Sequence, residues 1–318
     1  MTTVGLDIGG TKILGAVVEE DGTILARGKR DTAAEDPTAI VAAAADLVDE
    51  LAGDGDVEAV GVAVAGFLDR ERERVVFAPN VSWRGESLRA DLAALVRLPV
   101  VIENDANAAT WGEFVHGSAK DVDDLLFLTI GTGVGGGVVT DGQLLRGAFG
   151  MGAELGHMRV VPNGRLCGCG IHGCLEQYAS GTALVRSAQH LVASGAPEAA
   201  VLANRCGGDA RTLTGRDVTD AAMQGDPAAV GLLAELGRWL GEGVASLAAI
   251  LDPEVVLIGG GVSQAGALLL DPAREAFTEH LTGRGFRPQA RLLLAELLDD
   301  AGVVGAAALA RDLVRTGR

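Results

Sequence analysis

The sequence predicts an α/β protein in which a βββαβα unit occurs twice, with a cleft between the two lobes. Apolar, strand-like segments alternate with helix-like segments along the chain, a pattern typical of parallel strands covered by helices. A strand, a turn rich in Gly and Thr, and an Asp-Gly hairpin occur near residues 4–28 and again near residues 125–147. This repetition is the main reason to expect a duplicated, two-lobed core.

Composition indicates a globular protein and argues against a nucleic-acid partner. Apolar residues make up 48% of the 318 residues and charged residues 22%, so the chain can bury a core. The formal net charge is −17, whereas a general nucleic-acid surface needs clustered Lys and Arg. No apolar run approaches the roughly 18 residues that span a bilayer, and we see no export signal. We therefore expect a cytoplasmic protein without a membrane partner.

The first copy should begin with three strands within residues 4–30. A helix is expected from about Pro37 to Leu51, because proline is favoured in the first helical turn. Residues 58–69 are expected to form a buried strand that runs into a loop. Residues 98–110 should hold a strand that meets a helix at Asn104-Asp105.

The second copy should begin with the apolar strand of residues 125–133, followed by a hairpin around Asp141-Gly142. We expect a polar loop over 203–216 and a long helix capped at Asp226-Pro227. The other expected elements are a helix near 183–193, a strand and Gly-rich loop within 252–263, and a closing helix at 301–315.

Residues 154–176 carry a dense set of metal-ligand side chains. Cys167, Cys169 and Cys174, with His157 ten residues ahead, make the closed set of a structural zinc site, with no open position for catalysis. His172 is the alternative histidine ligand. A disulfide framework is the rival interpretation, although four cysteines in 318 residues are sparse and Cys-x-Cys is a poor disulfide spacing.

Three glycine-rich turns follow apolar strands, at residues 9–12, 131–133 and 259–261. Neither a dinucleotide-binding fingerprint nor a Walker loop fits, because the required helix or spacing is missing. We expect the backbone N–H groups and Thr hydroxyls of these turns to bind phosphate, with Asp7 holding Mg²⁺ directly or through water. The alternative is that they are only tight turns.

Asp105 lies where a strand ends and a helix begins. The helix start should favour its charged form, and a carboxylate in a cleft can accept the proton of an attacking hydroxyl. An ordinary helix N-cap explains the same residue equally well.

These segments together resemble the ROK group of sugar kinases and repressors, within the actin and hexokinase-type ATPase superfamily, whose fold is ribonuclease H-like. The resemblance covers essentially the whole chain. It is carried by DIGGTK (7–12), ENDANAA (103–109), IGTGVGGG (130–137), ELGH (154–157), CGCGIHGCLE (167–176) and VVLIGGG (255–261).

The resemblance implies an ATP-dependent hexose kinase, most like a glucokinase that phosphorylates the 6-hydroxyl of glucose, with ATP and Mg²⁺ and a structural zinc. It implies Asp105 as the catalytic base and His157, Cys167, Cys169 and Cys174 as zinc ligands. The implied sugar ligands are Gly66, Asn80, Asn104, Asp105, Glu154, His157 and Glu176. The implied nucleotide contacts are Asp7, Gly9, Gly10, Thr11, Lys12, Thr132, Gly133, Gly260 and Gly261.

The resemblance also implies a small lobe of residues 1–108, completed by the last helix at about 302–318, and a large lobe of residues 109–301 that carries the zinc loop. A homodimer or homotetramer is expected. One departure is Ala65 before Gly66, where the family usually has proline, which bears on the pose of Gly66 and Asn80. Only three residues precede Val4, so we expect no DNA-binding segment. Kinases of other hexoses or N-acetylhexosamines, a non-catalytic sugar sensor and a polyphosphate-dependent kinase are the alternatives.

Overall fold

The computed structural model describes residues 1–53 and 55–317. Its residues form two compact units. Unit 1 comprises Met1–Asp123, Gly137–Ala153 and Glu296–Arg318, and unit 2 comprises Asp124–Gly136 and Glu154–Ala295. Within the described residues, no helix is both long and apolar enough to cross a membrane.

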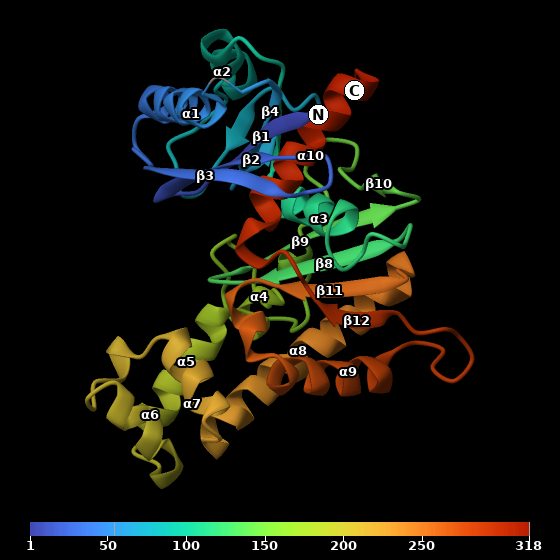
Figure 1. Ribbon diagram of the computed structural model, residues 1–318. Coiled ribbons are helices and arrows are strands. Elements are labelled where there is room, and N and C mark those ends of the chain that lie inside the picture. The colour runs from blue at the N-terminus through green and yellow to red at the C-terminus, as the bar shows by residue number, and fades with distance from the viewer. Residues whose placement is uncertain (54, 318) are drawn as a thin grey trace. The chain divides into compact units, whose positions relative to one another are not determined.

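Unit 1 contains a five-stranded sheet in the order β3-β2-β1-β4-β7 (Figure 1). Strand β1 pairs with β2 in antiparallel fashion and with β4 in parallel, and β4 pairs in parallel with β7. Ile8 lies opposite Val64, and Val64 lies opposite Asn104, so the carboxyl ends of the three parallel strands are level. The strands are β1 (Thr2–Ile8), β2 (Lys12–Val18), β3 (Ile24–Asp31), β4 (Val57–Val64) and β7 (Val100–Asn104).

Helices cover both faces of this sheet. Val4, Leu6 and Ile8 of β1 join a core with the apolar residues of α1 (Pro37–Ala52) and α2 (Leu88–Val96). On the other face, α10 (Ala301–Thr316) contacts β1, β4 and α3 (Asp105–Val115). In Figure 1, α10, in red, runs beside the blue strands. A small hairpin of β5 (Phe67–Leu68) and β6 (Val75–Phe77) follows β4.

The second sheet has the order β10-β9-β8-β11-β12, which repeats the order of the first. Its strands are β8 (Leu125–Ile130), β9 (Val134–Thr140), β10 (Gln143–Leu144), β11 (Val255–Gly259) and β12 (Arg291–Leu294). The division between the two units falls inside β9. The repeated strand order confirms the duplicated α/β core predicted from the sequence.

Unit 2 is richer in helices than the sequence pattern indicated. Its α-helices are α4 (Glu176–Ala179), α5 (Gly181–Ala193), α6 (Ala200–Arg205), α7 (Gly215–Met223), α8 (Pro227–Leu251) and α9 (Ala267–His280). The side chain of Asp226 caps α8, as expected. The expected loop 203–216 is shorter, because Thr214 and Asp217 form a capping box that starts α7 at Gly215.

The packing of α10 depends on glycines that let backbones touch. A Cβ on Gly5 or Gly61 of the sheet would overlap a carbonyl oxygen of α10, at Val303 and Ala306. A Cβ on Gly305 of α10 would overlap the carbonyl oxygen of Ala108 in α3. The helix therefore fits only because these positions lack side chains.

We predict opposite effects from two Gly→Ala substitutions inside helices. Gly305→Ala should destabilise the protein by more than about 1–3 kcal/mol, the usual cost of overpacking, because the new methyl group meets backbone atoms. Gly231→Ala in α8 should stabilise it by up to about 1 kcal/mol, because Gly231 is exposed with nothing near its missing Cβ. Thermal unfolding of both variants measures the effects, and equal melting temperatures would contradict the packing described here.

Candidate functional site

The predicted site residues fall into two groups, one in each unit. Unit 1 contains Asp7, the loop 9–12, Gly66, Asn80, Asn104 and Asp105, and unit 2 contains the rest. In unit 1 these residues lie at or just beyond the carboxyl ends of β1, β4 and β7, or in the loop after β6. The carboxyl edge of parallel strands is where α/β proteins usually bind ligands.

Asn104 and Asp105 form the junction between β7 and α3. The N-cap of α3 is Asn104, not Asp105, because the Asn104 side chain accepts the N–H of Asn107 at 3.1 Å. The amide nitrogen of Asn104 also donates to the Asp105 carboxylate at 3.0 Å and to the carbonyl oxygen of Gly66 at 3.2 Å. One side chain thus begins the helix, orients the carboxylate and ties the junction to the loop after β4.

The ionisation of Asp105 differs from the sequence-based expectation. Burial raises the pKa of this carboxyl above its ordinary value and outweighs the hydrogen bonds from Ala106 N–H and Asn104, which lower it. The helix start was expected to favour the charged form. That prediction was wrong in direction, because the cost of desolvating a buried charge exceeds the effect of the helix terminus.

Gly66 and Gly10 are held in places that exclude a side chain. A Cβ on Gly66 would lie 2.8 Å from the carbonyl oxygen of Phe77, and a Cβ on Gly10 would lie 2.7 Å from the Cβ of Asn80. Gly66 therefore packs on the strand end of β6 with Ala65, not proline, before it. Asn80 is exposed and packs against the first glycine-rich turn, which a Gly9 N–H to Lys12 carbonyl bond of 3.0 Å closes.

Asp7 shares the electrostatic environment of Asp105. Burial is the largest cause that raises the pKa of Asp7, to about 6, and the nearby charge of Asp105 raises it further, while Lys12 acts in the opposite direction. Oδ2 of Asp7 faces Gly302 at the start of α10, where a Cβ would lie 3.0 Å away. Two carboxyl groups with raised pKa values therefore share this strand edge, which favours binding of a proton or a cation there.

The metal-ligand residues predicted in unit 2 form one cluster. The ligand atoms of His157, Cys167, Cys169 and Cys174 all lie within 4.8 Å of one another. Sγ of Cys169 and Cys174 are 3.6 Å apart, and Sγ of Cys167 is 3.7 Å from Nδ1 of His157. Thiolates on a tetrahedral zinc with bonds of about 2.3 Å would be about 3.8 Å apart, so the donor set fits this ion.

The alternative interpretations of this segment lose support. His172 is exposed, and its Nδ1 lies 2.9 Å from the carbonyl oxygen of Gly164, outside the cluster. All four cysteines of the chain are free thiols. Gly173 adopts a φ of +86° where a Cβ would overlap the carbonyl of Val161, so glycine is required to fold the loop.

His157 is oriented in two directions. Its Nδ1 faces the cysteines, and its Nε2 lies 3.9 Å from Oε2 of Glu154. If the Nδ1 atom is bound to a metal, Nε2 carries the proton and becomes a hydrogen-bond donor. Glu176, two residues after Cys174, accepts the Val134 N–H at 3.1 Å through Oε2 and the Cys167 thiol at 3.3 Å through Oε1. The cluster and both glutamates therefore form one polar group in unit 2.

The other two glycine-rich turns border a cavity of about 660 Å³ in unit 2. Of the predicted nucleotide contacts, Thr132 and Gly261 line this cavity. Gly133 packs instead against the Glu176 carboxylate, and Gly260, which has a φ of +82°, packs against the backbone of Ile130. The remaining lining residues were not predicted from the sequence. They come from α5, α7 and the segment after Gly261, and they include Thr182, Arg216, Thr219, Met223 and Gln264. The capping box that starts α7 was the only sequence signal for this wall.

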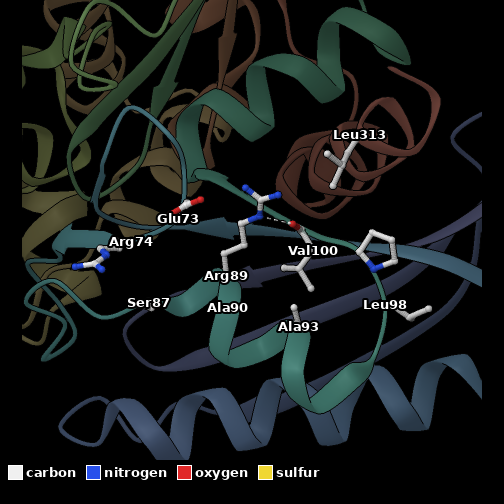
Figure 2. A pocket seen from close by; sticks show the side chains of 10 residues that line it. Glu73, Arg74, Ser87, Arg89, Ala90, Ala93, Leu98, Val100 and Leu313 are labelled. Atoms are coloured by element: carbon white, nitrogen blue, oxygen red, sulfur yellow. Dashed lines mark hydrogen bonds between the residues drawn. The ribbon is translucent and has the colours of Figure 1, made fainter. Parts of the chain in front are cut away.

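A second cavity, of about 570 Å³, lies in unit 1 (Figure 2). It is bounded by α2, the start of β7 and Leu313 of α10, and it contains none of the predicted site residues. Nε of Arg89 donates to the carbonyl oxygen of Val100 at 3.0 Å across this cavity, as the dashed line in Figure 2 shows.

Comparisons with known proteins cover the whole chain. Residues 3–313 match the ROK family. The chain is 47% identical over 310 residues to a glucokinase of Streptomyces coelicolor, with 98% of each chain covered. It is 37% identical over 313 residues to a glucokinase of Thermotoga maritima, again with 98% of each covered.

The crystal structure of a ROK family glucokinase from Streptomyces griseus, in complex with glucose and AMPPNP, has the same fold. It matches with a TM-score of 0.88 and 49% identity, covering 98% of this chain and 100% of that one. With sequence, fold and motifs in agreement from end to end, this chain belongs to the ROK family.

Proposed function

We propose that this protein is an ATP-dependent glucokinase, which transfers the γ-phosphoryl group of ATP to the 6-hydroxyl of glucose. The observation that carries the proposal is the partly buried carboxylate of Asp105, which has a raised pKa and is held by Asn104 at the carboxyl edge of the sheet. The similarity to glucokinases of two bacteria and to a glucose-bound ROK glucokinase supports the choice of reaction and substrate.

Asp105 is the proposed general base. Oδ1 of its side chain accepts Asn104 Nδ2 at 3.0 Å and the Ala106 N–H at 2.9 Å. Oδ2 is therefore the atom that takes the proton of the sugar hydroxyl as the oxygen attacks phosphorus. A raised pKa makes the carboxylate a stronger base than a surface aspartate, which favours this proton transfer. Positioning and charge neutralisation supply most of the remaining acceleration in phosphoryl transfer.

We assign hexose contacts in each unit separately. From unit 1 we assign the Gly66 backbone and the side chains of Asn80, Asn104 and Asp105. From unit 2 we assign Glu154, Nε2 of His157 and Glu176. Carboxylates and an imidazole N–H suit a ligand rich in hydroxyl groups, because each hydroxyl can donate one hydrogen bond and accept others.

The nucleotide is assigned to the glycine-rich turns and the 660 Å³ cavity of unit 2. In unit 2, Thr132, Gly133, Gly260 and Gly261 would contact phosphates through N–H and hydroxyl groups. In unit 1, the loop 9–12 is a separate proposed phosphate contact. Mg²⁺, held by Asp7 directly or through water, would neutralise phosphate charge. Apolar Val185, Val262 and Met223 in the cavity wall suit the nucleoside.

Zinc is proposed as a structural ion on His157 and the three cysteines. When bound, it would cross-link the segment of Glu154–His157 to the loop before Glu176 and hold the tautomer of His157. We also propose a cytoplasmic enzyme, since free thiols suit a reducing compartment, and an assembly of two or four copies. Size-exclusion chromatography with light scattering measures the assembly.

The function is tested by following ADP formation with MgATP and a panel of hexoses. We expect sugar-dependent ADP with glucose giving the highest kcat/KM. A higher kcat/KM for N-acetylmannosamine, fructose or allose would identify that sugar as the preferred substrate in place of glucose. The absence of turnover with every sugar would refute the proposed kinase activity.

The assignment of the base predicts the behaviour of Asp105→Asn. We expect kcat to fall about 10²–10⁴-fold, the usual contribution of a general base, with the affinity for glucose changed little. Asp226→Asn is the matched control, because asparagine also caps helices well and the site is untouched. Steady-state kinetics and glucose titration measure both; a variant at position 105 that keeps most of its kcat would refute the role.

The structural zinc predicts a link between metal content and hexose binding. The purified enzyme should contain one zinc per chain, and chelation or Cys174→Ser should raise KM for glucose and lower the melting temperature together. Cys206→Ser should change neither, because Cys206 lies outside the cluster. Elemental analysis with kinetics decides, and a metal-free enzyme of full affinity would overturn the assignment.

The raised pKa of Asp7 predicts that its charged carboxylate lowers the free energy of unfolding. Because the pKa of Asp7 in the folded protein, about 6, exceeds its ordinary value of 3.8, the charged form destabilises the fold above about pH 6 and has no such effect below pH 4. Asp7→Asn should therefore raise the free energy of unfolding by about 2–3 kcal/mol at pH 8 in metal-free buffer, with little change at pH 4. Denaturant unfolding at both pH values measures this. An unchanged stability at pH 8 would contradict it.

A further inference from the structure

Glu103, next to the proposed site residues Asn104 and Asp105, is a buried carboxylate that the proposed reaction does not use. Its residue is only 3% exposed, on β7 one position before Asn104. Buried glutamates are rare unless their charge is paired and hydrogen-bonded. The position therefore requires partners that hold the carboxylate in place.

Both oxygens of Glu103 are fully engaged. Oε1 accepts the backbone N–H of Asn104 at 3.2 Å and the side-chain amide of Asn107 at 3.1 Å. Oε2 accepts a hydrogen bond from Nε of Arg146 at 2.7 Å and lies 3.7 Å from Nη1 of Arg72. The first oxygen thus holds the β7–α3 junction, and the second holds two segments that are distant in sequence.

Those two segments also touch each other. Arg72 adopts a left-handed backbone with a φ of +56° in the turn between β5 and β6, where Oδ1 of Asp69 accepts two backbone N–H groups, from Glu73 at 2.7 Å and Arg74 at 3.2 Å. A Cβ on Gly150 would lie 2.9 Å from the carbonyl oxygen of Asp69. The turn 69–74 and the loop 145–153 therefore pack together and meet at one carboxylate.

We propose that Glu103 is a positioning residue that clamps the β7–α3 junction to these two segments, and so fixes Asn104 and Asp105 for catalysis. The inference rests on the proposed function, in which Asp105 must meet a sugar hydroxyl. The clamp acts through Asn104 in particular. Asn104 donates its backbone N–H to Glu103, and its side-chain amide donates to the Asp105 carboxylate and to the carbonyl oxygen of Gly66.

The chemistry of the clamp makes it sensitive to charge as well as to shape. Glu103→Gln keeps an oxygen for Asn104 and Asn107, but its amide would place a donor against the guanidinium of Arg146. The pair is charge-assisted, short and mostly buried, so losing the charge leaves a cation of Arg146 without its partner. A misplacement of the base by about 1 Å can cost about 10²-fold in rate, so a loosened junction should be visible in kcat.

The test compares Glu103→Gln with Glu113→Gln, which is a matched control on α3. Glu113 is 0% exposed, and it accepts backbone N–H groups of Ser118, Glu296 and Leu297, but no residue assigned to the site. Both variants should lose thermal stability. Only Glu103→Gln should lower kcat for glucose by tenfold or more, whereas Glu113→Gln should keep kcat within twofold.

Two further measurements separate the clamp from the reaction. Arg146→Lys keeps a cation at this position, so it should retain a higher kcat than Arg146→Met. The double variant Glu103→Gln/Arg146→Met should have a kcat only slightly below that of the slower single variant, because each substitution breaks the same Glu103–Arg146 interaction. Backbone hydrogen exchange over residues 100–108 should accelerate in Glu103→Gln and not in Glu113→Gln, and this readout needs no substrate.

The outcomes distinguish the proposals. An inactive wild-type enzyme with faster exchange in Glu103→Gln would refute the kinase and leave the clamp standing. Any of three results would overturn the clamp. They are a kcat of Glu103→Gln within twofold of wild type, losses of kcat that multiply in the double variant, and unchanged hydrogen exchange over residues 100–108.

Discussion

The structure depends on the register of its parallel strands. In unit 1, β1, β4 and β7 end level with one another, and the residues that follow them are the glycine-rich turn, Gly66 and Asp105. In unit 2, β8 and β11 are also parallel, with Gly259 opposite Thr129, and each runs into a glycine-rich turn. Backbone pairing therefore collects residues that lie about a hundred positions apart or more in the sequence at one edge of each sheet.

Glycines at selected positions let α10 contact the sheet closely and leave room for polar side chains at this strand edge. Glycines of β1, β4 and α10 let a helix lie directly on the sheet, and Gly302 leaves room for the carboxylate of Asp7. Asp7 and Asp105 are both partly buried, which raises the pKa values of both carboxyl groups. Packing that is favourable for the fold thus creates carboxylates that are costly when charged, a combination typical of functional sites.

Sequence reasoning predicted what depends on local pattern. The duplicated strand order follows from repeated segments, and the cluster of His157 and three cysteines follows from ligands within a short stretch, so the sequence pattern predicts both. The direction of the Asp105 pKa shift was predicted wrongly, because desolvation of the carboxyl group outweighs the hydrogen bonds that it accepts at the helix start. Glu103 and Arg146, separated by 43 positions, form a pair that no spacing rule indicates. The cavity walls of α7 were missed because a polar segment concealed a capped helix.

We propose that partial burial at the strand edge raises the pKa of Asp105 and makes its carboxylate basic enough to take a hydroxyl proton. The pH dependence of kcat/KM for glucose, at saturating MgATP, reports the ionisation of the base in the enzyme before glucose binds. We expect an acid limb whose midpoint lies clearly above the ordinary aspartate pKa of about 4, and we expect this limb to persist in the activity that Asp7→Asn retains. A profile that stays flat down to about pH 4, or a limb that vanishes with Asp7→Asn, would contradict it.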